Sequence, residues 1–184
     1  MGIIRPPEPV KLFAGVLTSL TGRLQEIEDR LAGLFGPVES RSEMFPFDHT
    51  DYYDTEMGAQ LVRVFVGFRD LVTPGDLPQV KIRTNGLETE LAQTFGTVAR
   101  PVNIDPGYLE QSKIVLASTK NFSHRIFLSD GIYAEVTMYF EARQWRRFPW
   151  TFPDFRSGRY DRFFMELRSA YRSQLGLKPG STSR

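Results

Sequence analysis

The chain has 184 residues and a formal net charge of +1; 41% of its residues are hydrophobic and 24% are charged. These values are typical of one globular domain and exclude a disordered chain. The chain has no cysteine, which excludes a disulfide framework, a thiol nucleophile and thiolate metal sites. Its balanced charge argues against nucleic acid as the partner.

Neither a signal sequence nor a membrane segment is recognisable. The first residues, Met-Gly-Ile-Ile-Arg-Pro-Pro, lack the apolar stretch of a signal sequence. The longest apolar runs, such as residues 114–117, are far too short to cross a bilayer. We therefore expect a cytoplasmic protein that does not contact a membrane.

Strand and helix patterns alternate in the first half of the chain. Residues 10–18 are a mostly apolar run, typical of a strand that is covered on both faces. Apolar residues at helical spacing follow, until a Gly-Pro pair ends the pattern. Residues 38–47 are a weaker strand candidate, residues 61–68 are a stronger one, and residues 77–94 repeat the helical spacing.

The second half of the chain predicts mainly strands. Their ranges are 100–104, 114–117, 124–128 and 132–140. Asp105-Pro106-Gly107 is predicted to form a tight turn, because proline fixes φ and glycine permits a positive φ. Ser129-Asp130-Gly131 predicts a hairpin turn between the last two strands. The apolar stripe of residues 158–175 then predicts a C-terminal helix.

This order of elements predicts a single α+β domain. Its sheet is expected to be mixed but largely antiparallel, with about three helices. The first six elements have the β-α-β-β-α-β order of a ferredoxin-like unit, to which a hairpin and the C-terminal helix are added. We expect the domain to cover residues 1–176 and residues 177–184 to be a flexible tail.

The sequence lacks the motifs of several common active sites. The phosphate loop GxxxxGK[ST], the dinucleotide fingerprint GxGxxG, the nucleophile elbow GxSxG and the zinc motif HExxH do not occur. Any nucleotide site in this chain must therefore differ from the P-loop and Rossmann sites.

The segment 48–58 is acidic. Asp48, Asp51, Asp54 and Glu56 supply the carboxylate oxygens that hard cations prefer. Their spacing does not match a calcium loop, and the alternative is a solvated connector. We expect no metal site, and the sequence indicates no particular cofactor.

Two polar side chains lie around the turn predicted after residue 104. Such a turn can present Asn103, Asp105 and backbone amides to a ligand. The alternative is that Asp105 only bonds its own backbone.

The predicted hairpin carries charged side chains at its start and on one face. Lys120, His124 and Arg125 enter it through a loop and suit an anion such as phosphate, unless the histidine is an ordinary surface residue. Polar and apolar residues alternate along the second strand, which places Glu135 on the polar face. That face either lines a ligand groove, with Glu135 as a base or a metal ligand, or is the solvent side of the sheet, or is partly covered by the C-terminal helix.

Lysine is rare in this arginine-rich chain. Only five lysines occur, and four of them lie in or beside the segments described above: Lys11, Lys81, Lys113 and Lys120. Lysine is a compact, mobile cation with three donors, and inside a buried strand it needs a partner or a ligand. We predict that at least two of the four meet in one cleft with Arg100 or Arg125, facing Asp105 or Glu135; the alternative is chance.

Residues 143–159 interleave arginines with aromatic rings. Proteins that bind single-stranded nucleic acid use this combination, but only when the rings are exposed. We favour the alternative that Trp145, Trp150 and Phe152 wedge the C-terminal helix onto the sheet.

Several phrases occur together in a characteristic order and spacing. They include Pro9-Val10-Lys11-Leu12-Phe13-Ala14-Gly15, Lys81 with Thr84-Asn85, Val102-Asn103-Ile104-Asp105-Pro106-Gly107-Tyr108-Leu109, Gly131-Ile132-Tyr133-Ala134-Glu135-Val136-Thr137 and Trp150-Thr151-Phe152-Pro153-Asp154. Over about residues 5–175 the chain resembles the bacterial domain-of-unknown-function family 4416. The resemblance implies a single bacterial domain but transfers no reaction and no site. Some members are labelled GTP-binding, although the motifs that would justify this label are missing here.

We therefore expect a cytoplasmic protein, an enzyme or a binding protein, that recognises a phosphate-bearing small molecule or a nucleotide without a P-loop. The alternative is a non-catalytic interaction module that uses the acidic segment 48–58 or the basic aromatic segment 143–159. No catalytic residue is identified. The candidate ligand-binding residues are Lys11, Lys81, Asn85, Arg100, Asn103, Asp105, Lys113, Lys120, His124, Arg125 and Glu135.

Overall fold

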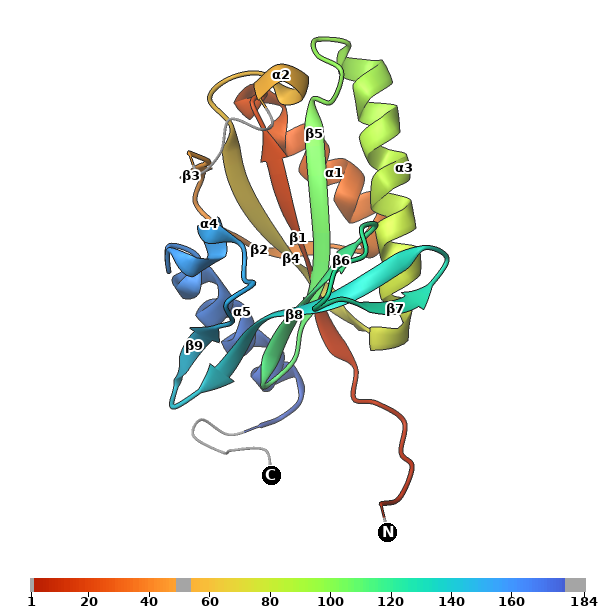
Figure 1. Cartoon of the computed structure of the whole chain (residues 1–184), viewed down its shortest axis with the longest axis vertical. Helices are drawn as coiled ribbons and strands as arrows, with labels where there is room; N and C mark the ends of the chain where they lie inside the picture. The colour runs from red at the N-terminus through yellow and green to blue at the C-terminus, as the bar shows by residue number, and fades with distance from the viewer. Residues whose placement is uncertain (1, 49–53, 178–184) are drawn as a thin grey trace.

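The computed structural model describes residues 2–48 and 54–177. Within these residues nine strands form one antiparallel sheet in the order β2-β4-β1-β5-β6-β8-β7, with β3 beside β4 and β9 beside β8 (Figure 1). The strands are β1 (Val10–Thr18), β2 (Val38–Arg41), β3 (Phe45–Pro46), β4 (Val62–Val72), β5 (Val102–Leu109), β6 (Lys113–Ser118), β7 (Ile126–Ser129), β8 (Ile132–Glu141) and β9 (Gln144–Arg147). The helices are α1 (Leu24–Phe35), α2 (Asp54–Met57), α3 (Leu77–Phe95), α4 (Pro153–Arg156) and α5 (Asp161–Gln174).

This architecture confirms the predicted α+β fold. The order β2-β4-β1-β5 is that of a ferredoxin-like unit, in which α1 connects β1 to β2 and α3 connects β4 to β5. The helices α1, α3 and α5 are the three long ones. The C-terminal helix begins later than predicted, because Gly158, with a φ of 82°, separates α5 from the single turn of α4.

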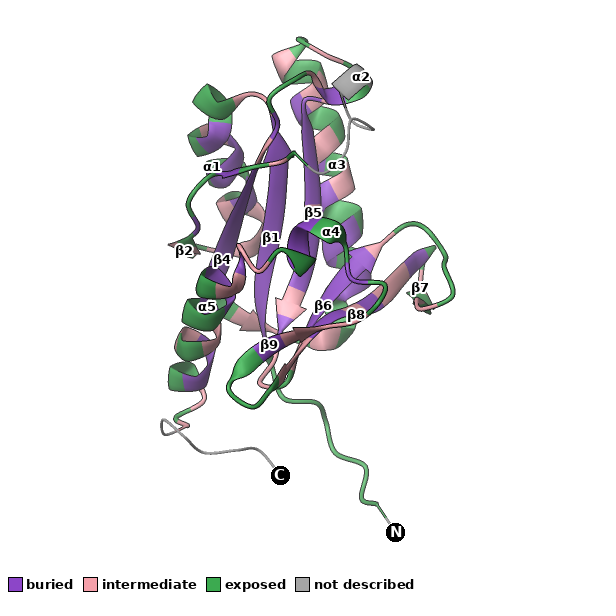
Figure 2. Ribbon diagram, turned by 60° about the vertical axis from the view of Figure 1, so that its left-hand side comes forward, coloured by how far each residue is buried: buried purple, intermediate pink, exposed green. Residues whose placement is uncertain are grey.

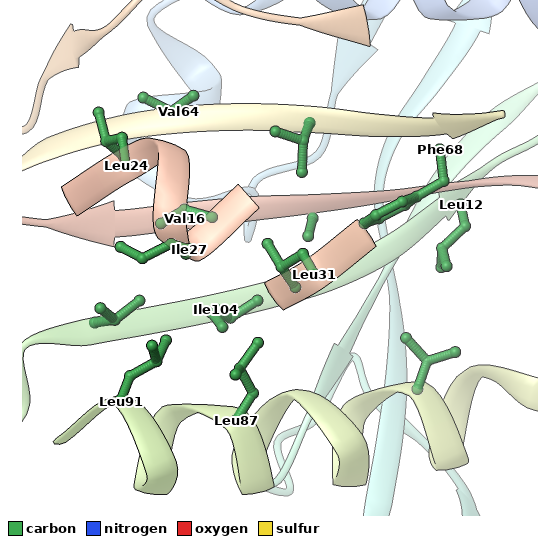
Figure 3. Packing of buried hydrophobic residues seen from close by; sticks show 14 residues of the cluster. Leu12, Val16, Leu24, Ile27, Leu31, Val64, Phe68, Leu87, Leu91 and Ile104 are labelled. Carbon is green, nitrogen blue, oxygen red and sulfur yellow. The ribbon is translucent and has the colours of Figure 1, made fainter. Parts of the chain in front are cut away.

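One face of the sheet is covered by α1 and α3 and is mainly aliphatic. Side chains at every second position of β1, β4 and β5 point to this face, as the two-residue period of a strand requires. Figure 3 shows them interlocking with the helices; the labelled residues are Leu12, Val16, Leu24, Ile27, Leu31, Val64, Phe68, Leu87, Leu91 and Ile104. This layer forms the hydrophobic core of the ferredoxin-like unit.

The opposite face is covered by α4 and α5 and is aromatic. Phe13 and Phe65 from the sheet meet Phe164, with ring centroids 5.1 Å apart in both pairs. Trp145 of β9 and Phe155 of α4 close the same cluster. In Figure 2 the buried residues run along the central strands, whereas the outer faces of the helices are exposed.

The sheet divides between β5 and β6. These strands pair only over Gly107–Leu109, so the first half of β5 has β1 as its one strand partner. Beyond this point β6 and β8 run across the direction of β1 and β5 (Figure 1). The division leaves room between the two halves of the sheet.

The turn predicted at Asp105-Pro106-Gly107 is wrong, because all three residues lie inside β5. Pro106 has no N–H group to donate. It fits in β5 because it precedes Gly107, where pairing with β6 begins, so no strand on that side needs a donor from it. Gly107 is required by close packing: a Cβ atom would lie 2.5 Å from the Val115 carbonyl oxygen and 2.8 Å from the Phe13 ring. A proline and a glycine therefore mark a crossing point of the sheet instead of a turn.

Two hairpins build the outer half of the sheet. The predicted turn between β7 and β8 is confirmed, with Asp130 and Gly131 at φ of 53° and 77°. A second turn, between β8 and β9, was not expected from the sequence because Ala142 and Arg143 adopt positive φ without any glycine. The strand β7 forms the end of the sheet.

Candidate functional site

A cleft opens where β5 and β6 separate. Its larger chamber has a volume of about 330 Å³ and is lined by Phe47, Arg63, Asp105, Leu116, Ala117, Ser118, Arg125, Glu135, Phe152, Pro153, Asp154 and Phe155. An adjoining smaller chamber of about 190 Å³ is lined by Glu56, Lys81, Arg100, Asn103, Asp105, Ala117, Ser118, Thr119, Lys120, Arg125 and Phe152. The two chambers share five residues, so they form one continuous cleft with an aromatic end and a cationic end.

An ion pair that crosses β1 forms the floor of the larger chamber. Arg63 of β4 and Asp105 of β5 lie on the same face of the sheet, and Arg63 Nη1 donates to Asp105 Oδ2 at 2.8 Å. In the strand between them, Gly15 lies opposite Asp105 on one side and opposite Phe65 on the other. A Cβ atom there would lie 3.2 Å from Arg63 Nη1 and 2.9 Å from the Phe65 ring. Gly15 therefore provides the space through which the guanidinium reaches the carboxylate.

The charges of this pair are stabilised by their neighbours. Burial alone would raise the pKa of Asp105, but the positive charges of Arg63 and Lys81 and hydrogen bonds from Arg63 and Asn103 outweigh it, so the pKa is lowered. Burial would likewise lower the pKa of Arg63, but Asp105 and Asp154 outweigh it and raise the pKa. Both groups are therefore charged at neutral pH.

Asp154 of α4 closes the floor from the other side. Its Oδ2 lies 3.8 Å from Arg63 Nη2 and accepts a hydrogen bond of 3.1 Å from the hydroxyl of Tyr160. Burial, followed by the charge of Asp154, raises the pKa of Tyr160, so the phenol stays protonated and remains a donor. Arg63 thus lies between two carboxylates, each of which has a second partner.

Side chains of α3 replace the missing strand along the open edge of β5. The Ile104 amide donates to Glu88 Oε1 at 2.7 Å, and Lys81 Nζ donates to the Ile104 carbonyl at 2.8 Å. Burial raises the pKa of Glu88, although Lys81 and Arg100 oppose this shift. Lys81 Nζ also lies 4.0 Å from Asp105 Oδ1. These contacts satisfy the strand edge and bring two cations to the smaller chamber.

Glu135 anchors the opposite wall. Its Oε2 accepts a hydrogen bond of 2.8 Å from Arg125 Nε and lies 3.1 Å from His124 Nε2. Thr137 Oγ1 donates to the other oxygen at 3.2 Å. Arg125 Nη1 also donates to Ser118 Oγ at 2.8 Å, which orients the guanidinium across the cleft.

The polar face of β8 is buried at Glu135 and Thr137, so the solvent-side alternative is wrong for these two residues. A bulge between Ile114 and Val115 shifts the register of β6 against β8. The segment 148–155 then covers the polar face. Thr151 fixes this cover by donating to the Thr137 carbonyl at 2.6 Å.

The covering segment also places aromatic rings at the rim of the cleft. Trp150 stacks between His124 and Phe148, with centroids 5.5 Å and 4.8 Å away. Phe152 faces Arg125, whose guanidinium carbon lies 5.9 Å from the ring centroid. Trp145 is buried in the core, but Trp150 and Phe152 are each 42% exposed, so the expectation that all three wedge the helix is wrong for these two.

The structure brings most of the predicted site residues to the cleft. Seven of them line it: Lys81, Arg100, Asn103, Asp105, Lys120, Arg125 and Glu135. His124 joins through its contact with Glu135. Two of the four lysines, Lys81 and Lys120, therefore meet with both arginines and face Asp105, which is the convergence expected from the sequence.

Three predicted site residues lie elsewhere. Lys11 is fully buried and binds Glu39, the Arg69 carbonyl and Gln174, so its charge is satisfied within the fold. Lys113 pairs with Glu110 at 2.6 Å. Asn85 lies on α3 and is not among the residues that line either chamber.

Sequence reasoning missed several residues of the cleft, chiefly Arg63, Asp154 and the rings of Phe47 and Phe155. Arg63 had a usable signal: it occupies an inward position of an apolar strand, two residues before Phe65. An unpaired charge is costly at such a position, so an acidic partner should have been sought. Asp154 gave no such signal, because only the fold brings α4 to β4.

The structure describes only part of the acidic segment 48–58. Its residues 49–53, including Asp51, lie outside the described residues, whereas Glu56 lines the smaller chamber. Within residues 2–48 and 54–177 no cluster of three or more His, Asp or Glu side chains is arranged to hold a metal ion. In the same part of the chain no helix combines the length and apolar character needed to cross a bilayer.

Comparison with known proteins identifies a family. Neither the curated proteins nor the solved structures include a significant match to this chain. The model of the family described as "Domain of unknown function (DUF4416)" matches residues 8–171. The matched range contains all nine described strands and every residue that lines the cleft. This confirms the resemblance stated from the sequence, and the chain belongs to the DUF4416 family.

Proposed function

We propose that the cleft binds a small anionic molecule of the phosphate-ester class, such as a nucleotide or a sugar phosphate. Its anionic group would lie in the smaller chamber, and its apolar or planar part in the larger chamber. The observation that carries this proposal is the division of one cleft into an aromatic end and a cationic end. The larger chamber is within the range of small-molecule sites, which begins at roughly 300 Å³.

The cationic end supplies donors that the fold does not fully use. Lys81 Nζ makes one hydrogen bond to a carbonyl, and an ammonium has three donors. Lys120 is exposed at the rim, and Arg100 adds a half-buried guanidinium. Charge-assisted hydrogen bonds from such groups are the usual means of holding a phosphate.

The carboxylates of the cleft favour a ligand with donor groups of its own. Asp105 is one-third exposed, so a lone pair remains accessible beside its bonds to Arg63 and Asn103. An anion alone would meet repulsion at this carboxylate. A nucleotide or a sugar phosphate combines an anionic group with amine or hydroxyl donors, and therefore suits both ends of the cleft.

The interaction-module alternative receives less support. In the basic aromatic segment Arg147 pairs with Asp161, and Arg159 donates to the Pro46 carbonyl at 2.6 Å. These arginines hold the fold together instead of presenting free charge. The cytoplasmic location stays a prediction.

The experiment is thermal denaturation with inorganic phosphate, a nucleoside monophosphate and a hexose phosphate. A ligand present at 100 times its Kd should stabilise the native state by about 2.7 kcal/mol. Lys120→Ala should weaken binding of every phosphate compound by about tenfold, the loss expected for one charge-assisted hydrogen bond. Lys113→Ala is the matched control, because this lysine pairs with Glu110 away from the cleft.

A second variant separates the two ends of the cleft. Phe152→Ala removes a ring at the junction of the chambers, so it should weaken binding of the nucleotide more than that of inorganic phosphate. No stabilisation by any of the compounds, or equal losses in the Lys120 and Lys113 variants, would overturn the proposal.

A further inference from the structure

The outer edge of β7 is apolar and open. This strand ends the sheet and, among the described residues, pairs with β8 alone. Its first three side chains, Ile126, Phe127 and Leu128, are 71%, 56% and 39% exposed, and Phe122 in the preceding loop is 64% exposed. Proteins usually guard such an edge with charges, proline or a covering element, because unpaired N–H and C=O groups template further pairing. Residues 126–129 contain no charge and no proline.

A second unpartnered apolar segment lies at the start of the described chain. Residues 2–9 leave β1 as an extended arm that points away from the body (Figures 1 and 2). Ile3 and Ile4 on this arm are 78% and 100% exposed. Adjacent exposed isoleucines are costly in water, and their burial would be favourable.

The sequence of the arm favours an extended conformation. Pro6, Pro7 and Pro9 have fixed φ, and Arg5 and Glu8, which precede prolines, are restricted to extended conformations. Residues 6–9 form a semi-rigid spacer of about 12 Å, at about 3.1 Å per residue. The spacer holds the isoleucines away from the body of their own chain.

We infer that the arm of one copy pairs with the β7 edge of a second copy, and that two copies exchange arms reciprocally. Residues 2–5 are the part of the arm that retains consecutive N–H donors, and their number equals that of β7, Ile126–Ser129. Pairing buries Ile3 and Ile4 against the exposed side chains of β7, by addition of a strand to a sheet edge. Reciprocal exchange gives a closed dimer with two equivalent contacts.

Charge selects the direction of the pairing. Arg5 follows the isoleucine pair, and the exposed carboxylate of Asp130 follows β7. A parallel alignment places Arg5 beside the exposed carboxylate of Asp130, whereas an antiparallel alignment places it beside Arg125, whose guanidinium already pairs with Glu135 in the cleft. The added strand is therefore expected to run parallel to β7.

The first test is the mass of the full chain in solution, measured by light scattering over a range of micromolar concentrations. The wild type should be a dimer. Replacing both arm residues, Ile3→Ser with Ile4→Ser, should raise the dimer dissociation constant by at least about tenfold, and Ile126→Lys should do the same. Met44→Lys is the control, because Met44 is 52% exposed on another part of the molecule.

A cross-linking test identifies the contact. The chain has no cysteine, so engineered thiols report alone. A mixture of Ile4→Cys and Leu128→Cys proteins, whose substituted residues face each other in the parallel alignment, should form a mixed two-chain disulfide in preference to either homodimer. A chain that carries both substitutions and closes on itself as a monomer would show docking within one copy and overturn the inference. A monomeric wild type, or a dimer that Ile126→Lys breaks but the arm variant does not, would overturn it as well.

Discussion

The two faces of the central sheet differ in their side chains and in their roles. The face under α1 and α3 is mainly aliphatic and continuous, and it contains branched side chains that interlock along the ferredoxin-like unit. The face under α4 and α5 is aromatic, and its strands also carry Arg63, Asn103 and Asp105. The first face holds the fold together, and α3 adds Lys81 to the cleft at its edge. The second holds the fold at one end and forms the cleft at the other.

The difference follows from the extent of the covering helices. α3 has 19 residues and follows β5 closely, whereas α5 has 14 residues and packs beside the aromatic cluster. The remaining part of the second face is covered by the segment 148–155, which reaches the sheet through large rings. The cleft lies between these rings and the polar residues of the sheet.

The largest expected effect is at the centre of the aromatic cluster. Phe164 is fully buried and contacts the rings of Phe13, Phe65 and Phe155. Phe164→Ala should lower the free energy of unfolding by about 3–5 kcal/mol, the usual cost of deleting a buried ring. Urea denaturation measures this cost, and Met165→Ala, an exposed neighbour on the same helix, should have little effect. A fully stable Phe164→Ala protein would show that the aromatic face is not a core.

The next effect concerns the charges of that face. Arg63→Ala leaves Asp154 buried without a cation and Asp105 with Lys81 alone, and should lower the free energy of unfolding by about 3 kcal/mol. This is the lower end of the usual range, because Asp105 is one-third exposed. Arg30→Ala, which breaks the exposed pair with Glu90, should cost less than about 1 kcal/mol. Equal costs at the two arginines would remove the distinction between the cleft and the surface.

A smaller effect is expected where β1 passes beneath the ion pair. Gly15→Ala places a methyl group against Phe65 and the Arg63 guanidinium, and such overpacking costs about 1–3 kcal/mol. The same change should weaken phosphate binding, because Arg63 must move away from Asp105. Gly33→Ala is the control, since nothing lies within 4 Å of the added atom on α1. Equal stability of the two variants would contradict the role given to Gly15.

The smallest effect is a dependence on pH. The pKa of Asp105 is lower in the folded state than in the unfolded state, so its contribution to stability is present above the unfolded pKa and is lost as the pH falls through the folded pKa. Wild type should therefore exceed Asp105→Asn in free energy of unfolding at pH 7, and this gap should close below about pH 4. Urea titrations at several pH values measure the gap. A gap that is constant with pH would assign the effect of Asp105 to shape instead of charge.

Glu88 is expected to act in the opposite sense. Burial raises its folded pKa, so its contribution is present below the unfolded pKa and is lost as the pH rises through the folded pKa. In Glu88→Gln this loss at higher pH should disappear. The comparison of the two variants separates the two carboxylates of the cleft.

The fold was largely predictable because its strands and helices have clear periods. The apolar run of β1, the spacing of α1 and the Asp130-Gly131 turn each specify local structure through neighbours in the sequence. The turn prediction failed because a proline followed by a glycine usually forms a turn. In this sheet Pro106 lies where β5 has no partner on one side, and Gly107 allows the close approach of β6 and Phe13. Local rules cannot reveal which strand will lie across a given glycine.

Only the charged residues of the site could be predicted from the sequence. Asp105, Arg125 and Glu135 stand out because they interrupt apolar segments or accompany a turn. Lys11 has the same signal but is satisfied by Glu39 and Gln174 at the far end of β1, a difference that depends on contacts between distant segments. Phe152 was expected to pack the helix onto the sheet, but it is 42% exposed and lines the cleft, because its exposure depends on how the segment 148–155 folds over the sheet.

The central position of β1 has a consequence for how the chain reaches its native state. β1 is complete at Thr18, but its two partners do not begin until Val62 and Val102. During synthesis its apolar residues must therefore remain unpaired while most of the first half of the chain is made. The outer hairpins need only neighbouring residues and can close as soon as they emerge. We expect the ribosome-bound chain to depend on a holding chaperone until β5 is released, and to assemble its two half-sheets by different routes.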